Sequence, residues 1–241
     1  MTAETPIYLD HNATTPILPE VVDAMLPYLR EHFGNPSSGH VYGRRAHDAV
    51  ERARGQVAAL LGCDDGEVIF TSGGTEANNL AIRGVAEARN DRRHVVTTAI
   101  EHPATEQPCA WLERHGMRLT RIGVDVGGRA RVEQARAAVD TATALVTVMH
   151  SNNETGVLQP IADLAGLAHA VGAILHTDAA QSAGKIAVDV EALGVDLLTL
   201  AGHKFYAPKG VGALYVRAGT SVRPVLHGAE QEHGLRPGTE N

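Results

Sequence analysis

The sequence predicts an α/β fold in which helices flank a mostly parallel central sheet. Short apolar runs alternate along the chain with Ala-rich helical stretches, and strands separated by helices indicate βαβ units. Hydrophobic residues make up 44% of the 241 residues, but aromatic residues only 4%. The core must therefore consist of Ala, Val, Leu and Ile, which suits helices packed on a parallel sheet. A chain of this length can bury one sizeable core.

The chain opens with an extended segment and two helices. Residues 5–16 are expected to be extended, with Pro near both ends. Residues 19–33 are expected to be helical and to end at the loop GNPSSG, residues 34–39. A second helix over residues 43–61 stops at Gly62.

An alternating region follows, and it carries the sheet. The expected strands are 67–71, 94–99, 144–149, 173–177, 196–200 and 212–216. The expected helices between them are 75–89, 104–115, 131–138 and 160–171. Ligands bind at the carboxyl ends of strands in open sheets of this kind, so functional residues should follow the strands directly.

Composition argues against several classes of function. The net charge of −7 is spread along the chain, which argues against non-specific nucleic-acid binding. The N-terminus has no signal-peptide pattern, and no apolar run approaches the roughly 20 residues of a membrane helix. Cys63 and Cys109 are too few for a disulfide framework and lack metal-ligand spacing. We therefore expect a cytoplasmic protein without a membrane or nucleic-acid partner.

The first two candidate sites follow the strands 67–71 and 94–99. Gly73, Gly74 and Thr75 open a helix, so backbone N–H groups and the helix dipole favour an anion there. A capped strand–helix turn would have the same sequence. His102 follows the next strand and could stack on a flat ligand or transfer protons, although a lone His is more often structural.

Three further candidates follow later strands. Asn153 lies in a polar loop, which alone could be a simple turn. Asp178 ends an apolar strand, and a buried carboxylate there needs a cationic partner such as a protonated pyridine nitrogen. Lys204 follows a core strand, and a desolvated lysine is a good nucleophile toward an aldehyde. Lys209 competes with it, but its Pro-Lys-Gly context favours an exposed turn. Together these residues match the needs of bound pyridoxal 5′-phosphate.

Eight motifs in order extend this interpretation to a family. They are YLDHNATTP, FGNPSS, EVIFTSGGTEANNLAI, EH at 101–102, MHSNNETGVLQPI, HTDAAQS, GHKFYAPKGVGALYVR and GLRPGTEN. From Tyr8 to Asn241 the chain resembles the cysteine desulfurases of the nitrogen-fixation and iron–sulfur-assembly type. These are class V, fold-type I enzymes that use pyridoxal 5′-phosphate. The resemblance implies the large domain of the PLP-dependent transferase fold.

The resemblance implies roles for the residues around the cofactor's aldehyde and phosphate. Lys204 would hold the cofactor as a Schiff base. Gly74, Thr75 and His203 would bind the phosphate. Thr239 resembles a threonine that reaches the phosphate in the partner subunit of a homodimer.

Four other residues would surround the cofactor ring. His102 would stack on the ring and assist proton transfer, and Asp178 would pair with the ring nitrogen. Gln181 would bond the ring hydroxyl, and Asn153 would lie near the cofactor and the substrate carboxylate.

The implied reaction removes sulfur from L-cysteine, leaving L-alanine, and stores the sulfur as an enzyme persulfide. A sulfur-acceptor protein such as an iron–sulfur scaffold would then receive it. A selenocysteine lyase or another class V enzyme would share these motifs, and a non-catalytic PLP-binding fragment or scaffold is the alternative for this chain alone. The motifs do not identify the final acceptor.

Three departures from the family pattern qualify the resemblance. Ala201 stands where the family often has a hydroxyl residue. The segment HGAEQEHGLRPGTEN differs from the usual form at Ala229, Glu230, His233 and Pro237. The family continues past Asn241 into a small domain with the nucleophilic cysteine and a carboxylate-binding arginine. The expected organisation is thus an N-terminal strap over residues 1–15 and a large domain over 16–241, without the small domain. Neither cysteine matches the persulfide cysteine.

Overall fold

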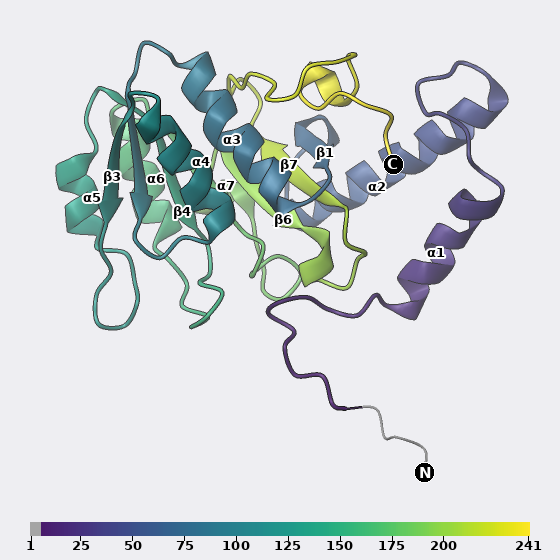
Figure 1. Cartoon of the computed structure of the whole chain (residues 1–241), viewed down its shortest axis with the longest axis horizontal. Coiled ribbons are helices and arrows are strands. Elements are labelled where there is room, and N and C mark those ends of the chain that lie inside the picture. The colour runs from purple at the N-terminus through teal and green to yellow at the C-terminus, as the bar shows by residue number, and fades with distance from the viewer. Residues whose placement is uncertain (1–5) are drawn as a thin grey trace.

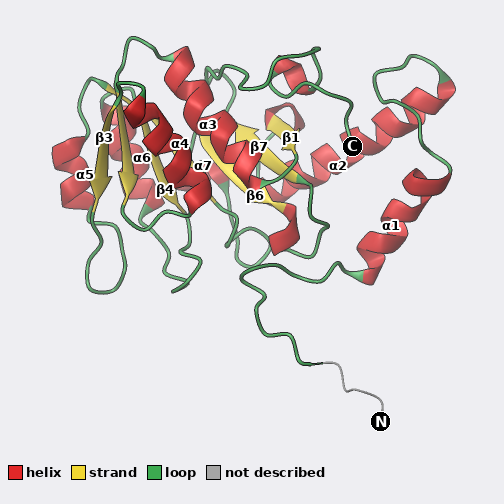
Figure 2. Ribbon diagram, in the orientation of Figure 1, coloured by secondary structure: helices red, strands yellow, loops and turns green. Residues whose placement is uncertain are grey.

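The computed structural model describes residues 6–241 and contains a sheet of seven strands (Figures 1 and 2). Residues 1–5 of the expected strap lie outside the described residues. The strands are β1 (Val68–Thr71), β2 (His94–Thr98), β3 (Arg118–Ile122), β4 (Thr143–Met149), β5 (Ile174–Asp178), β6 (Leu197–Ala201) and β7 (Gly212–Val216). Their order is β1-β7-β6-β5-β4-β2-β3.

All neighbouring strands from β6 to β3 pair in parallel, and β7 runs antiparallel to both β1 and β6. This confirms the prediction of a mostly parallel sheet. The carboxyl ends of β4, β5 and β6 therefore meet at one edge, where the sequence places its candidate residues.

Helices α2 to α7 cover both faces of the sheet (Figure 1). The helices of the described residues are α1 (Pro19–Arg30), α2 (Val41–Leu61), α3 (Gly74–Ala88), α4 (Pro103–Arg114), α5 (Val132–Ala138), α6 (Ile161–Ala170) and α7 (Val190–Leu193). Apolar side chains of α3 and α4 form one core layer, and those of α2, α5, α6 and α7 form the other.

Alternation along each strand builds the two layers. Val95 and Leu145 belong to the layer under α3 and α4, while their neighbours Val96 and Val146 belong to the opposite layer. Successive side chains of a strand point to opposite faces, so a sheet covered on both sides needs continuous apolar runs. This explains why the strands are runs of Val, Leu and Ile rather than alternating patterns.

Local chemistry sets the helix ends at the functional edge. Gly73 precedes α3 with φ 150°, a conformation that favours glycine, and no side chain caps this helix. His102 caps α4 by accepting the Ala104 N–H at Nδ1, over 3.1 Å, and Pro103 occupies the first turn. In both turns the candidate residues lie between the end of a strand and the N-terminus of the next helix.

The structure contains one strand and one α-helix that the sequence pattern did not predict. The strand β3 lies at the sheet edge, and of its residues only Ile122 is buried. Two of its five residues are the exposed Arg118 and Arg121, which weaken the apolar signal, and charged side chains are typical of edge strands. The short helix α7 also escaped prediction, because a single turn carries no helical periodicity.

The N-terminal helix α1 lies apart from the sheet (Figure 1) and ends at Arg30, three residues before the expected position 33. None of its side chains is buried. Exposed apolar side chains accumulate in and around it: Ile7, Leu9, Ile17, Leu18, Val22, Leu29, Phe33, Val41 and Tyr42. Within residues 6–241 the helices are too short or too polar to span a lipid bilayer.

Candidate active site

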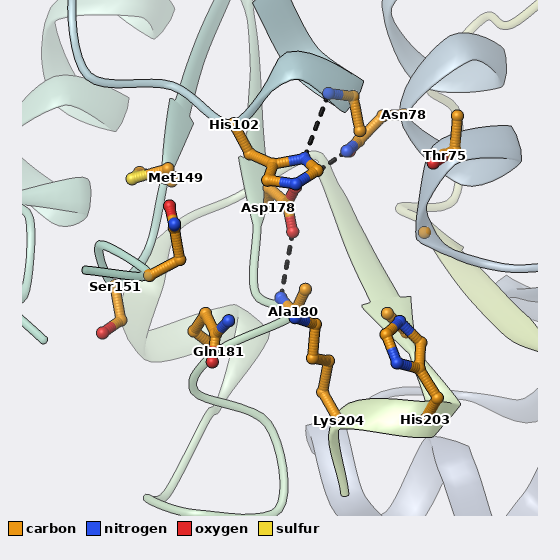
Figure 3. A pocket seen from close by; sticks show the side chains of 14 residues that line it. Thr75, Asn78, His102, Met149, Ser151, Asp178, Ala180, Gln181, His203 and Lys204 are labelled. Atoms are coloured by element: carbon orange, nitrogen blue, oxygen red, sulfur yellow. Dashed lines mark hydrogen bonds between the residues drawn. The ribbon is translucent and has the colours of Figure 1, made fainter. Parts of the chain in front are cut away.

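A pocket opens at the carboxyl ends of β4, β5 and β6, beside the N-terminus of α3 (Figure 3). Eight of the nine residues predicted from the sequence line it: Gly74, Thr75, His102, Asn153, Asp178, Gln181, His203 and Lys204. The ninth, Thr239, is exposed on the C-terminal segment and does not line this pocket. The competing lysine, Lys209, is exposed and lies outside the lining as well.

The first turn of α3 forms one wall. With no capping side chain, its N–H groups are available to a ligand, and the helix dipole favours an anion. A Cβ added to Gly74 would lie 3.1 Å from the Ala201 Cβ, so glycine lets α3 approach β6 this closely without a shift of either element. This wall is suited to a phosphate group.

One carboxylate, Glu76, lies in the same turn, but the positive charge of Arg236 balances its negative charge. Burial alone would raise its pKa, yet hydrogen bonds from Arg236 and the Ser72 N–H keep the pKa below its usual value. Arg236 Nε lies 2.9 Å from Glu76 Oε1, and Ser72 N lies 2.8 Å from Oε2. The ion pair preserves the preference of the helix end for an anion, and it ties the C-terminal segment to α3.

Asp178 forms the floor of the pocket at the end of β5. Its Oδ2 accepts from Asn78 Nδ2 over 2.7 Å, and its Oδ1 accepts the Ala180 N–H over 2.9 Å (Figure 3). The residue is 7% exposed, and burial raises its pKa despite these hydrogen bonds. Within residues 6–241 no cationic side chain forms an ion pair with it. The carboxylate thus favours a cationic ligand atom.

His102 faces the same pocket, with Asp178 behind it in the view of Figure 3. Its Nδ1 accepts the Ala104 N–H, so Nε2 is the ring nitrogen left available to a ligand. Its neighbour Glu101 is half-buried and anchors this turn to the end of β4. The Glu101 carboxyl accepts from Thr98 Oγ1 over 2.5 Å and from the Met149 N–H over 3.0 and 3.1 Å.

Lys204 and His203 lie in a short 3-10 turn, Gly202–Lys204, that follows β6. Burial lowers the pKa of Lys204, and the positive charge of Lys185 lowers it further, against the attraction of Asp178 and Asp10. A lowered pKa gives the amine more of the unprotonated form that attacks an aldehyde. Burial likewise lowers the pKa of His203, and Lys204 adds to this effect.

The N-terminal segment forms hydrogen bonds with the two remaining predicted residues, Gln181 and Asn153. Gln181 donates to the carbonyl oxygen of Asn12 over 2.9 Å and accepts from Lys185 Nζ over 3.0 Å. The side chain of Asn12 contacts the carbonyl oxygen of Asn153 over 3.4 Å. Residues 12–15 therefore run along the pocket and touch both sides of it.

The sequence did not single out Asn78, which is fully buried and holds Asp178. A signal was present, because an amide on the core-facing side of α3, beside Ala77 and Ala81, requires a polar partner in the core. Met149 and Ser151 also line the pocket without having been predicted.

The residues of the pocket fit pyridoxal 5′-phosphate. The open helix end suits its phosphate, the buried Asp178 suits its protonated ring nitrogen, and Lys204 suits its aldehyde. By fold and pocket, the chain falls within the α/β class of proteins that carry this cofactor.

Comparison with known sequences narrows the class. The profile of the class V aminotransferases matches residues 7–236, and the chain belongs to this family, whose members depend on pyridoxal 5′-phosphate. It is 48% identical over 236 residues to a protein of Dictyoglomus turgidum named cysteine desulfurase IscS, covering 98% of this chain and 60% of that protein. It is 50% identical over 235 residues to cysteine desulfurase 2 of Trichormus variabilis, covering 98% of this chain and 59% of that protein. The chain thus spans about 60% of the length of these relatives.

Solved structures agree with this assignment. A NifS-like protein superposes with a TM-score of 0.95 at 39% identity, covering 98% of this chain and 66% of that one. A structure described as SspA in complex with cysteine superposes with a TM-score of 0.94 at 40% identity, covering 98% of this chain and 69% of that one. The fold-type I architecture expected from the sequence is confirmed.

Proposed function

We propose that the chain is the pyridoxal-phosphate-binding large domain of a cysteine desulfurase, which takes sulfur from L-cysteine and leaves L-alanine. The names of the relatives support this, as does the neighbour described in complex with cysteine. The observation that carries the proposal is the convergence of the Lys204 amine and the Asp178 carboxylate on one pocket, beside the open end of α3.

The chain's own residues divide the work of holding the cofactor. The N–H groups of Gly74 and Thr75 would bind the phosphate together with His203. Asp178 would hold a proton on the ring nitrogen, because its buried carboxylate forms no ion pair among the described residues. Lys204 would attach the cofactor covalently. When bound, the cofactor would withdraw electrons from the substrate carbons through its protonated ring.

The other pocket residues would handle the substrate and its protons. His102 would stack on the ring and donate from Nε2, since Nδ1 is occupied by the Ala104 N–H. Gln181 would bond the ring hydroxyl once it leaves the Asn12 carbonyl. Asn153 would lie near the substrate carboxylate.

Sulfur transfer needs a thiolate other than the two in this chain. Burial raises the pKa of Cys63 to about 11, with the charges of Glu67 and Asp64 adding to the shift, and burial raises the pKa of Cys109 further still. Neither cysteine lines the pocket. A protonated thiol is a poor nucleophile, so we propose that the persulfide forms on a cysteine outside these 241 residues.

We further propose a homodimer and a second domain. Thr239 is exposed and lies outside its own chain's pocket, as expected of a residue that serves a partner subunit. The exposed apolar side chains around α1 give a further domain a surface to cover, and the relatives are longer than this chain. Delivery to an iron–sulfur scaffold and a cytoplasmic location remain predictions.

The cofactor site can be tested by chemical trapping. Incubation with pyridoxal 5′-phosphate, borohydride reduction and peptide mass spectrometry should place the label on Lys204. Lys204→Ala should lower incorporation at least about tenfold, because the attacking amine is gone. Lys209→Ala is the matched control and should label like the parent. Label on any other lysine, or equal labelling of Lys204→Ala, would refute the assignment.

A further inference from the structure

The N-terminal segment runs alongside the turn that carries Lys204 and is bonded to it on both sides of the lysine. The Thr15 N–H donates to the His203 carbonyl over 2.9 Å, and the Leu18 N–H donates to the Tyr206 carbonyl over 3.2 Å. In Figure 1 this segment passes below the turn after β6. Residues nearly 190 positions apart in the sequence are thereby joined next to the cofactor-binding lysine.

The hydroxyl of Thr15 bridges the two ends of this turn. Its Oγ1 donates to the His203 carbonyl over 3.0 Å and accepts the Tyr206 N–H over 2.8 Å. Thr15 is 3% exposed, so water does not replace these contacts. The two bonded groups lie immediately before Lys204 and two residues after it.

The backbone at Tyr206 explains why the turn needs an external support. Tyr206 has φ 70°, in the left-handed backbone region that residues other than glycine rarely adopt. The N–H of this same residue is the one that Thr15 Oγ1 accepts. Without the hydroxyl, the turn would lose an acceptor at its least favourable residue.

The same segment also contacts the far end of the lysine side chain. Lys204 Nζ donates to the Ala13 carbonyl over 3.0 Å and to the Asn12 carbonyl. The lysine is thus fixed at its backbone through Thr15 and at its amine through residues 12 and 13. Thr14 contributes less, since its Oγ1 lies 3.2 Å from His203 Nδ1 and 3.4 Å from the His203 carbonyl.

We propose that Thr15 is a positioning residue for Lys204, whose hydroxyl holds the backbone on both sides of the lysine in the conformation that accepts the cofactor. The inference rests on the proposed cofactor attachment at Lys204. It assigns residues 12–15 a task in the site.

The test compares three variants of the 241-residue chain with the parent. Thr15→Val removes the hydroxyl at nearly constant volume, and Thr15→Ser keeps it. Thr97→Val is the matched control, because the Thr97 hydroxyl is equally buried but has no hydrogen-bond partner. Two readouts are needed. One is amide hydrogen exchange of residues 203–207 in cofactor-free protein, and the other is the dissociation constant of pyridoxal 5′-phosphate with borohydride trapping at Lys204.

Thr15→Val should accelerate exchange of the Tyr206 amide and weaken cofactor binding, each about tenfold, as expected for a buried N–H that loses its acceptor. Thr15→Ser should restore both, and Thr97→Val should match the parent. If Thr15→Val does not fold, Thr15→Ala gives the same comparison. Exchange and binding equal to the parent in the hydroxyl-free variant would overturn the inference, as would equal losses in Thr97→Val. A parent that traps no cofactor at Lys204 would instead contradict the proposed function, and the exchange arm would still test Thr15.

Discussion

At the scale of single residues, the ionised carboxylate of Asp178 lowers the free energy of unfolding because it is buried. Its partners are the neutral donors Asn78 and Ala180, and burial raises its pKa. The folded state therefore holds a proton more tightly than the unfolded chain does. The destabilisation is present above the unfolded pKa and disappears as the pH falls below it. A residue that lowers stability at neutral pH and faces a pocket has the pattern of a ligand-binding group.

We therefore expect Asp178→Asn to stabilise the cofactor-free chain and to weaken cofactor binding. The free energy of unfolding should rise by about 1 kcal/mol at pH 7, with the gain vanishing near pH 3. Asn78 can accommodate the new amide by turning its own, because Asn78 Oδ1 is buried without a partner. Urea unfolding at both pH values and cofactor titration measure the two effects.

The control for this prediction is Asp91→Asn, which removes a charge from an exposed loop. It should change neither stability nor cofactor binding. An Asp178→Asn chain that is less stable than the parent at pH 7 and binds cofactor normally would show that the carboxylate serves the fold and not the ligand.

At the scale of elements, a buried ion pair fastens the C-terminal segment to the sheet. Arg54 of α2 donates to both carboxylate oxygens of Glu232, over 2.7 and 2.9 Å, and to the Val68 carbonyl over 2.7 Å. Glu232 Oε2 also accepts the Phe70 N–H over 2.8 Å. Both charged side chains are at most 5% exposed. The pair joins α2, β1 and the segment that leads to Arg236 and the pocket.

Removing one partner of this pair should be costly. Glu232→Ala should lower the free energy of unfolding by up to about 3–5 kcal/mol, because it leaves the buried Arg54 charge with only the partly exposed Glu51, 3.1 Å from its Nε, as an ion-pair partner. Adding Arg54→Met to that variant should recover part of the loss. Glu133→Ala, which breaks the exposed pair with Arg136, should cost less than about 1 kcal/mol. Urea unfolding of the parent and these three variants gives these values, and a double variant that is less stable than Glu232→Ala would contradict the coupling.

The comparison of elements with the sequence shows which features a local pattern can predict. Strands covered on both faces, such as β4, are continuous apolar runs and were found. The edge strand β3 contains two exposed arginines among its five residues, so its pattern resembles a loop. Residues after strand ends, such as Lys204 and Asp178, were found because strand direction alone brings them together.

Contacts between distant segments could not be predicted in this way. The bond between Thr15 and Tyr206 depends on where the strap crosses the turn after β6, and no periodicity encodes that crossing. The contact of Asn78 with Asp178 spans 100 positions and depends on the packing of α3 against β5. Such pairings follow only from the assembled fold.

At the scale of the whole molecule, buried histidines and buried carboxyls give opposite dependences on pH. His176 lies between Thr147 and Thr199, and burial lowers its pKa from 6.5 to about 3. Burial raises the pKa of Glu101 from 4.5 to about 8, against the hydrogen bonds from Thr98 and Met149. Both groups are therefore neutral in the folded chain over much of the range between pH 4 and 7.

The sign of each effect follows from which state binds the proton. Between about pH 6.5 and 3 the unfolded chain protonates His176 and the folded chain does not, so stability falls as the pH falls. Between about pH 4.5 and 8 the folded chain keeps the proton of Glu101 and the unfolded chain releases it, so stability falls as the pH rises. The two effects offset each other between about pH 4.5 and 6.5, where we expect the greatest stability.

His176→Gln tests the acid side of this balance. Its amide can bond both neighbouring threonine hydroxyls but does not titrate. Below pH 6.5 the slope of unfolding free energy against pH should therefore decrease by up to about 1.4 kcal/mol per pH unit relative to the parent. Urea unfolding at several values between pH 3.5 and 8 measures the slope, with His227→Gln, at an exposed position, as the control that should leave it unchanged. If His176→Gln keeps the parent's slope, the imidazole is protonated inside the fold, and the sheet's Thr–His–Thr contacts must accommodate a charge.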